Sequence, residues 1–151
     1  FPKRPMRGRR IMRLFSNVHP GTLPRMWNVG EPFPDMAKKI LPRIKTPPAY
    51  QSWINFLTHP SNGLRSPYDT LMLGFHDTAK LSMDYQNATT KTEIAFPPGC
   101  TWLCYTDQVM HAALSGQFVL EQTFHLDIDV MADPARAPIR VLEKMTGRVL
   151  A

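Results

Sequence analysis

The feature that most constrains the fold of this chain is a change in the period of its apolar residues, from two at both ends to a helical repeat in the middle. Between Arg9 and Val18, apolar and polar residues alternate with the period of a β-strand. Both faces of this segment carry apolar groups, as in a strand inside a sandwich. One face carries Ile11, Arg13, Phe15 and Asn17, and the other carries Arg10, Met12, Leu14 and Ser16.

The stretch from Glu31 to Gln86 is predicted to be helical, because its prolines fall where helices commonly begin. The prolines that predict such starts are Pro34, Pro48 and Pro67. The clearest helix follows Ser66 as N-cap, with Pro67 at its first position and Asp69 in its first turn. The apolar stripe of this helix consists of Leu71, Met72, Phe75 and Ala79.

After Glu93 the period of two returns. It predicts strands at Thr101–Tyr105 and 117–127, with a turn at Ser115 and Gly116 between them, and Asp133 before a proline predicts a last short helix ending near Gly147. Strands on both sides of a helical block favour a mainly β jelly-roll barrel with a helical insertion. An open α+β fold is the alternative, whereas a βαβ sheet would need helices between consecutive strands.

The amino-acid composition and charge of the chain indicate its cellular compartment and the kind of partner it binds. The 151 residues contain only two cysteines, Cys100 and Cys104. Residues four positions apart on a strand are separated by about 13 Å, so these two cannot form a disulfide. So few cysteines, with no signal peptide and no long apolar run, predict one domain in a reducing compartment. The net charge is +6, and the first thirteen residues hold six bases and no acid, namely Lys3, Arg4, Arg7, Arg9, Arg10 and Arg13. This predicts an anionic partner, such as nucleic acid, a phosphorylated lipid surface or a carboxylate substrate, unless the strand is simply a solvated basic edge.

Two histidine motifs could carry chemistry. His125 and Asp127 form an H-x-D pair on a predicted strand, which places both side chains on one face, as the first two ligands of a 2-His-1-carboxylate iron site require. No histidine follows Asp127 to complete such a site, so we interpret this pair as structural. His111 stands where a predicted strand from Thr101 gives way to small residues, which leave room beside it for a ligand.

Five segments together resemble the C-terminal part of Kdo hydroxylases, the Fe(II)- and 2-oxoglutarate-dependent dioxygenases that hydroxylate 3-deoxy-D-manno-octulosonic acid (Kdo) in the lipopolysaccharide inner core. They are GRRIMRLFSNVHP, RMWNVGEPF, SPYDTLMLGFHDTAK, AFPPGCTWLCYTDQVMHAALSGQFVLEQTF and MADPARAPIRVLEKMTGR. The resemblance implies a double-stranded β-helix, which is a cupin-like jelly roll, with Fe(II), 2-oxoglutarate and O₂ as cofactor and co-substrates.

In that family an H-x-D pair and a distal histidine hold the iron, and His111 stands at the distal position. The resemblance places the H-x-D pair immediately before Phe1, where the chain opens without a methionine. We therefore expect residues 1–151 to be the C-terminal part of one N-terminally truncated dioxygenase domain, with a helical insertion at about 32–86. Such a fragment is expected to be inactive alone, because one histidine does not hold ferrous iron tightly.

The co-substrate needs a cation for its distal carboxylate, which many dioxygenases of this class place about ten residues after the distal histidine. Here that window holds Glu121 and Gln122 and no base. We assign the role to Arg13, because its strand would follow the expected H-x-D strand and an arginine suits a bidentate clamp. Asn17 and Gln122 are expected to add hydrogen bonds to the co-substrate, unless they are satisfied polar groups of the barrel.

The resemblance also implies an anionic glycolipid substrate, Kdo attached to lipid A, in the cytoplasm at the periphery of the inner membrane. The side chains expected to bind this substrate are Arg9, Arg10, Arg25, His76 and Asp77. Nucleic acid is then not expected as a partner, and the oligomeric state is left open.

Two other functions remain open from the sequence. One is a non-catalytic jelly-roll module that binds anionic glycolipid or nucleic acid through its basic N-terminal strand. The other is a cupin-like metal enzyme that uses His111 together with His125 and Asp127.

Overall fold

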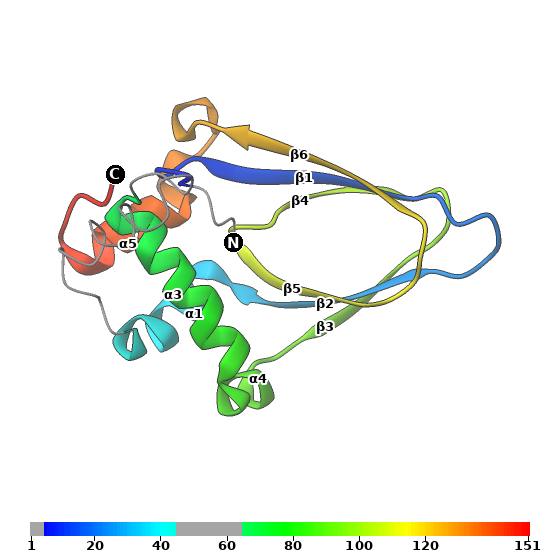
Figure 1. Ribbon diagram of the computed structural model, residues 1–151, viewed down its shortest axis with the longest axis horizontal. Helices are drawn as coiled ribbons and strands as arrows, with labels where there is room; N and C mark the ends of the chain where they lie inside the picture. Colours follow the sequence, from blue (N-terminus) through cyan, green and yellow to red (C-terminus); the bar gives the residue numbers. More distant parts are fainter. Residues whose placement is uncertain (1–4, 45–64) are drawn as a thin grey trace, which may run out of the picture.

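The computed structural model describes residues 5–44 and 65–151 and shows two antiparallel sheets that face each other, with the helices gathered at one end of them (Figure 1). One sheet has the order β4-β1-β6, with β1 at Arg10–Asn17, β4 at Thr101–Tyr105 and β6 at Val119–Leu126. The other has the order β3-β2-β5, with β2 at Arg25–Pro32, β3 at Thr92–Phe96 and β5 at Val109–Ser115. This mainly β jelly-roll architecture with helices between β2 and β3 confirms the predicted fold class.

Aromatic side chains fill the space between the two sheets. The indole of Trp27 on β2 lies 4.9 Å from the ring of Phe15 on β1 and 5.6 Å from that of Trp102 on β4, measured between centroids. Phe96 on β3 stacks on Trp102 at 3.9 Å. Because each pair joins strands of opposite sheets, these contacts hold the sheets together.

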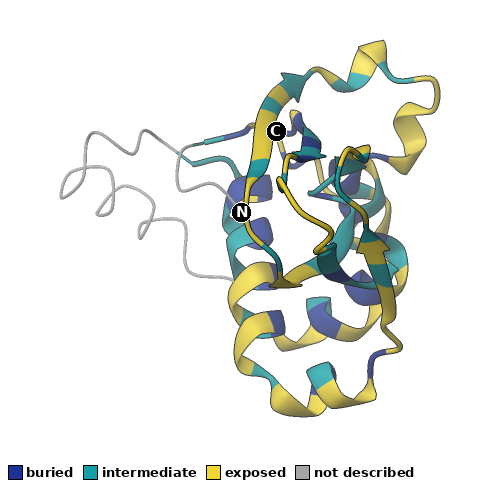
Figure 2. Ribbon diagram, turned by 90° about the vertical axis from the view of Figure 1, so that its right-hand side faces the viewer, coloured by how far each residue is buried: buried dark blue, intermediate teal, exposed yellow. Residues whose placement is uncertain are grey.

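The helices pack on one another at the end of the sheets and form a core of their own. They are α1 Phe33–Ile40, the 3₁₀ turn η1 Leu41–Arg43, α3 Pro67–Leu81, α4 Met83–Ala88, η3 Ile128–Val130, η4 Pro134–Arg136 and α5 Pro138–Thr146. Residues buried in this core include Phe33, Ile40, Tyr68, Phe75, Leu142 and Leu150. Figure 2 shows buried positions in the helices, whereas β5 and β6 contain only exposed and half-buried residues. None of the described helices is long and apolar enough to cross a membrane.

The start of α3 confirms the prediction made from its capping residues. The hydroxyl of Ser66 accepts a hydrogen bond from the backbone N–H of Asp69, and the Asp69 carboxylate accepts one from the N–H of Ser66, which is a complete capping box. The same carboxylate accepts the N–H of Met6 at 2.7 Å and so fixes the segment before β1 to the helix. The predicted helix start at Pro48 lies outside the described residues.

Three strands differ from expectation. β2 and β3 were not predicted, since β2 contains Gly30 and ends at Pro32, and both residues disfavour strands. The strand predicted at Thr101–Tyr105 is confirmed as β4. The chain then turns and forms a further strand, so His111 is the third residue of β5 rather than a residue just beyond the strand that begins at Thr101.

Two further predictions concern the C-terminal helix and the two cysteines. Asp133 caps only the short η4 turn, through a bond from the N–H of Ala135 at 3.2 Å. The helix α5 begins at Pro138 and ends at Thr146, followed by Gly147 with a left-handed φ of +66°. Cys100 and Cys104 are free thiols, as their spacing predicted.

A buried ion pair joins the start of β1 to the turn between β4 and β5. The Arg10 guanidinium, which is fully buried, donates from Nε to Oδ2 of Asp107 at 2.7 Å and from Nη2 to Oδ1 at 3.1 Å. It also donates to Gln108 at 2.8 Å and lies 4.2 Å above the ring of Tyr105. Burial raises the pKa of Asp107, while the hydrogen bonds from Arg10 oppose that shift.

We predict that replacing only one member of this pair, as in Arg10→Met, lowers the free energy of unfolding by about 3–5 kcal/mol, because Asp107 is left buried without its cation. Replacing both members, Arg10→Met with Asp107→Leu, should restore most of that loss. Urea unfolding of the three chains measures the difference. Equal stability of the single and double variants would contradict a buried, mutually dependent pair.

Candidate functional site

A cavity of about 720 Å³ lies between the helical end of the sheets and helices α3 and α4. Its barrel side includes Arg13 of β1 and His111 of β5, and its helical side includes Phe75 and His76 of α3 and Tyr85 of α4. The structure thus brings together three of the residues that the sequence singled out, Arg13, His76 and His111.

His111 has the geometry of a metal ligand. Its ring stacks on Trp27 with centroids 5.2 Å apart, and its Nδ1 lies 3.0 Å from the carbonyl oxygen of Val109. Since a carbonyl can only accept, Nδ1 carries the proton and the lone pair lies on Nε2. Burial lowers the pKa of His111, which favours the neutral ring that metals bind.

Arg13 faces the interior from β1 but already has a partner. Its Nη1 lies 3.0 Å from Oε1 of Glu121, which is on the inner face of β6. Its Nε is buried and has no hydrogen-bond partner among the described residues. Arg13 therefore retains N–H groups that could meet a carboxylate, although Glu121 neutralises part of its charge.

The described residues contain no group of three His, Cys, Asp or Glu side chains close enough to hold a metal ion. His125 lies beside Ile11 in the β1–β6 register, and the exposed Asp127 stands beyond the end of β6. They do not join His111 in a three-ligand set, which argues against the cupin-like alternative. His111 fits one iron ligand, and the rest of a ligand set is absent from the described residues.

The two other residues predicted to bind co-substrate are placed elsewhere. Asn17 is buried at the opposite end of β1, where its amide donates to the Phe96 carbonyl at 3.0 Å and accepts the N–H of His19 at 3.0 Å. Gln122 pairs with Leu14 and lies on the outer face of the sheet. The Asn17 amide is thus satisfied within the barrel, and the strand register turns Gln122 away from the interior.

The arginines predicted to bind substrate also lie away from the cavity. Arg10 is a buried structural cation, and Arg25 donates to the carbonyl of Gly116 in the turn at the far end of β5. Arg9 is exposed in the segment before β1. Only His76 of this set lines the cavity, and Asp77 beside it accepts a hydrogen bond from its Nδ1 at 3.1 Å.

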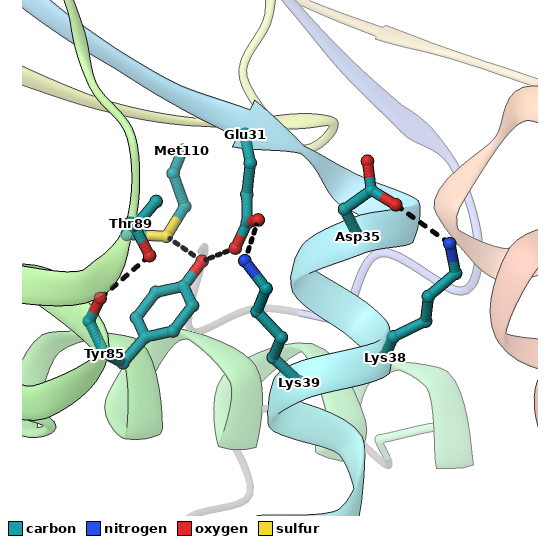
Figure 3. Close-up of polar contacts among 7 residues, drawn as sticks. All are labelled: Glu31, Asp35, Lys38, Lys39, Tyr85, Thr89 and Met110. Atoms are coloured by element: carbon teal, nitrogen blue, oxygen red, sulfur yellow. Dashed lines mark hydrogen bonds and ion pairs between the residues drawn. The ribbon is translucent and has the colours of Figure 1, made fainter.

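A hydrogen-bonded network supports the strand that carries His111, and no pattern in the sequence indicated it (Figure 3). The Tyr85 hydroxyl donates to Oε1 of Glu31 at 2.7 Å and lies 3.1 Å from Sδ of Met110, the residue before His111. Lys39 of α1 contacts the other oxygen of Glu31 at 2.5 Å. Burial and the hydrogen bond to Glu31 raise the pKa of Tyr85 well above its ordinary value, so the hydroxyl keeps its proton.

Comparison with solved structures gives three concordant matches to KdoO, described as a Kdo hydroxylase and a non-heme Fe(II) alphaketoglutarate-dependent dioxygenase. The apo structure has a TM-score of 0.94 and 41% identity and is matched over 99% of this chain and 51% of its own. The complex with alphaketoglutarate and Fe(III) has a TM-score of 0.95 and 40% identity over 100% of this chain and 51% of its own. The cobalt(II) complex has a TM-score of 0.94 and 41% identity over 99% and 50%.

This chain thus spans about half the length of the KdoO structures that it matches. No curated protein matches the sequence. The family model for 3-deoxy-D-manno-oct-2-ulosonic acid (Kdo) hydroxylase matches residues 1–149. With nearly the whole chain matched in sequence and in fold, this protein belongs to the Kdo hydroxylase family.

Proposed function

We propose that this chain forms the half of an Fe(II)- and 2-oxoglutarate-dependent dioxygenase that carries the distal histidine, and that the whole enzyme hydroxylates Kdo in the lipopolysaccharide inner core. The observation that carries the proposal is His111, whose Nε2 is left free for a metal by the bond between Nδ1 and Val109 on the wall of the cavity. The match to KdoO, solved with alphaketoglutarate and Fe(III), supports the chemistry.

Each residue of the site has a definable task in that reaction. Bound iron, with 2-oxoglutarate and O₂, would supply the oxidation of a substrate C–H bond. His111 would hold the metal through Nε2, while Trp27 stacks on its ring and fixes its orientation. Arg13 would bind the distal carboxylate of 2-oxoglutarate, in exchange for or beside Glu121.

We further propose that an H-x-D pair outside the described residues completes the metal site. β5 pairs with β2 on one side and has no second strand partner among the described strands. A further strand on that edge would lie next to His111, where two more ligands are needed. This chain alone is then expected to show no appreciable hydroxylation.

The substrate we propose is Kdo attached to lipid A, reached by peripheral contact with an anionic membrane surface on the cytoplasmic side. The placement of two arginines supports this proposal over the alternative of a non-catalytic basic strand. Of the bases on β1, Arg10 is buried and paired with Asp107, and Arg13 faces the barrel interior, so neither is presented on an outer surface to a nucleic acid or a membrane.

We predict that a chain extended upstream through an H-x-D pair binds Fe(II) and converts 2-oxoglutarate to succinate in the presence of a Kdo substrate. Residues 1–151 alone should neither bind Fe(II) tightly nor carry out this conversion. Replacement His111→Ala in the longer chain should weaken metal binding by about 100-fold or more. Calorimetric titration with Fe(II) under anaerobic conditions measures it. The matched control is His19→Ala, on the loop after β1. Full metal affinity without His111 would refute the assignment.

The lowered pKa of His111 predicts a pH dependence of stability. Its folded pKa lies below the unfolded value, so between the two the unfolded chain binds a proton that the folded chain does not. The free energy of unfolding should therefore fall as the pH drops below about 6.5. Replacement His111→Gln should make this fall shallower, as measured by urea unfolding at several pH values. An unchanged slope would show that His111 titrates normally.

A further inference from the structure

Two exposed lysines contribute positive charge to the lining of the cavity. Lys80 on α3 and Lys91, just before β3, both line it, and both are exposed. His76 lies one turn before Lys80 on the same helix and also lines the cavity. These three bases, two on α3 and one after α4, line the same cavity.

The acids next to these lysines in the sequence, Asp77 and Glu93, are exposed and form no ion pair with them within the described ranges. Asp107 is the one acid that lines the cavity there, and both of its oxygens bond to Arg10. Glu31 is nearby, but its two oxygens bond to Tyr85 and Lys39. Neither Lys80 nor Lys91 has an ion pair within the described ranges, in contrast to Lys38 and Lys39.

The deeper wall of the same cavity is apolar. Met36, Met72 and Phe75, which are buried, and the half-buried Met110 line it. A ligand here would therefore be drawn in by charge at the opening and desolvated further inside, where His111 lies. An anionic oxygen group on a larger molecule has the polarity that this arrangement accepts.

We propose that Lys80 and Lys91 form an anion-binding site that holds a carboxylate or phosphate of the substrate at the opening of the cavity, while the carbon to be oxidised approaches His111. This inference rests on the proposed function and assigns substrate recognition to residues other than Arg9, Arg10 and Arg25. The carboxylate of a sugar acid and the phosphate of a lipid headgroup share the required chemistry, and the two are separated by experiment.

The test measures binding to the full chain, without iron or 2-oxoglutarate, from ligand-induced changes in NMR spectra. One titration uses the methyl glycoside of Kdo, which has a carboxylate and no phosphate, and a second uses glucosamine 1-phosphate. We expect saturable binding of at least one, weakened about fivefold by Lys80→Gln or Lys91→Gln and about 20-fold by both together. The dependence of binding on salt should fall in the double variant.

The controls separate this site from general attraction to a basic protein. Lys144→Gln removes an exposed lysine of α5 that does not line the cavity and should leave binding unchanged, while Lys80→Arg with Lys91→Arg should retain it. Undiminished binding by the double glutamine variant, an equal loss with Lys144→Gln, or binding of neither ligand would overturn the inference. Because no metal is added, these outcomes do not test the role of His111 as a metal ligand, which the Fe(II) titration tests separately.

Discussion

The contact on which the structure depends is the packing of Trp27 between the sheets. Its indole touches Phe15 on β1, Phe96 on β3 and Trp102 on β4, and it stacks on the imidazole of His111 on β5. One side chain therefore sets the separation of the sheets and the orientation of the candidate metal ligand. The bond from His111 Nδ1 to the Val109 carbonyl then determines which ring nitrogen faces the cavity.

Charge pairing decides which bases remain available for ligands. The first strand is rich in arginine, but its fully buried member Arg10 is neutralised by Asp107, and its inward-facing member Arg13 by Glu121. Glu121 stands ten residues after His111, where many related enzymes are expected to carry the co-substrate cation. Arg13 and Glu121 form a pair in the barrel interior, and the lysines without an ion pair in the described ranges, Lys80 and Lys91, lie on the helical side of the cavity.

Local signals in the sequence were sufficient for some elements and not for others. The alternation of residues predicted which face of β1 carries Arg13, and Ser66 with Asp69 predicted the start of α3. Both predictions depend only on residues close together in the sequence. β2 and β5 pair with each other across a long stretch of sequence. This pairing stabilises β2 despite Gly30 and β5 after the turn that follows Tyr105, and local sequence patterns do not reveal it. The positions of Asn17 and Gln122 relative to the cavity also depend on pairing between distant segments, because the register of β1 with β6 sets them.

The helices between β2 and β3 and the strands of the barrel are joined by hydrogen bonds at the site. Tyr85 comes from α4, Glu31 from the end of β2 and Lys39 from α1, yet their hydrogen bonds converge beside Met110, the neighbour of His111 (Figure 3). Because Glu31 accepts from both Tyr85 and Lys39, movement of either helix would be transmitted to the start of β5. The segment between β2 and β3 thus supports the strand that carries His111 and also provides the basic opening of the cavity, so the two ends of a bound substrate would be held by parts of the fold that are fixed to each other.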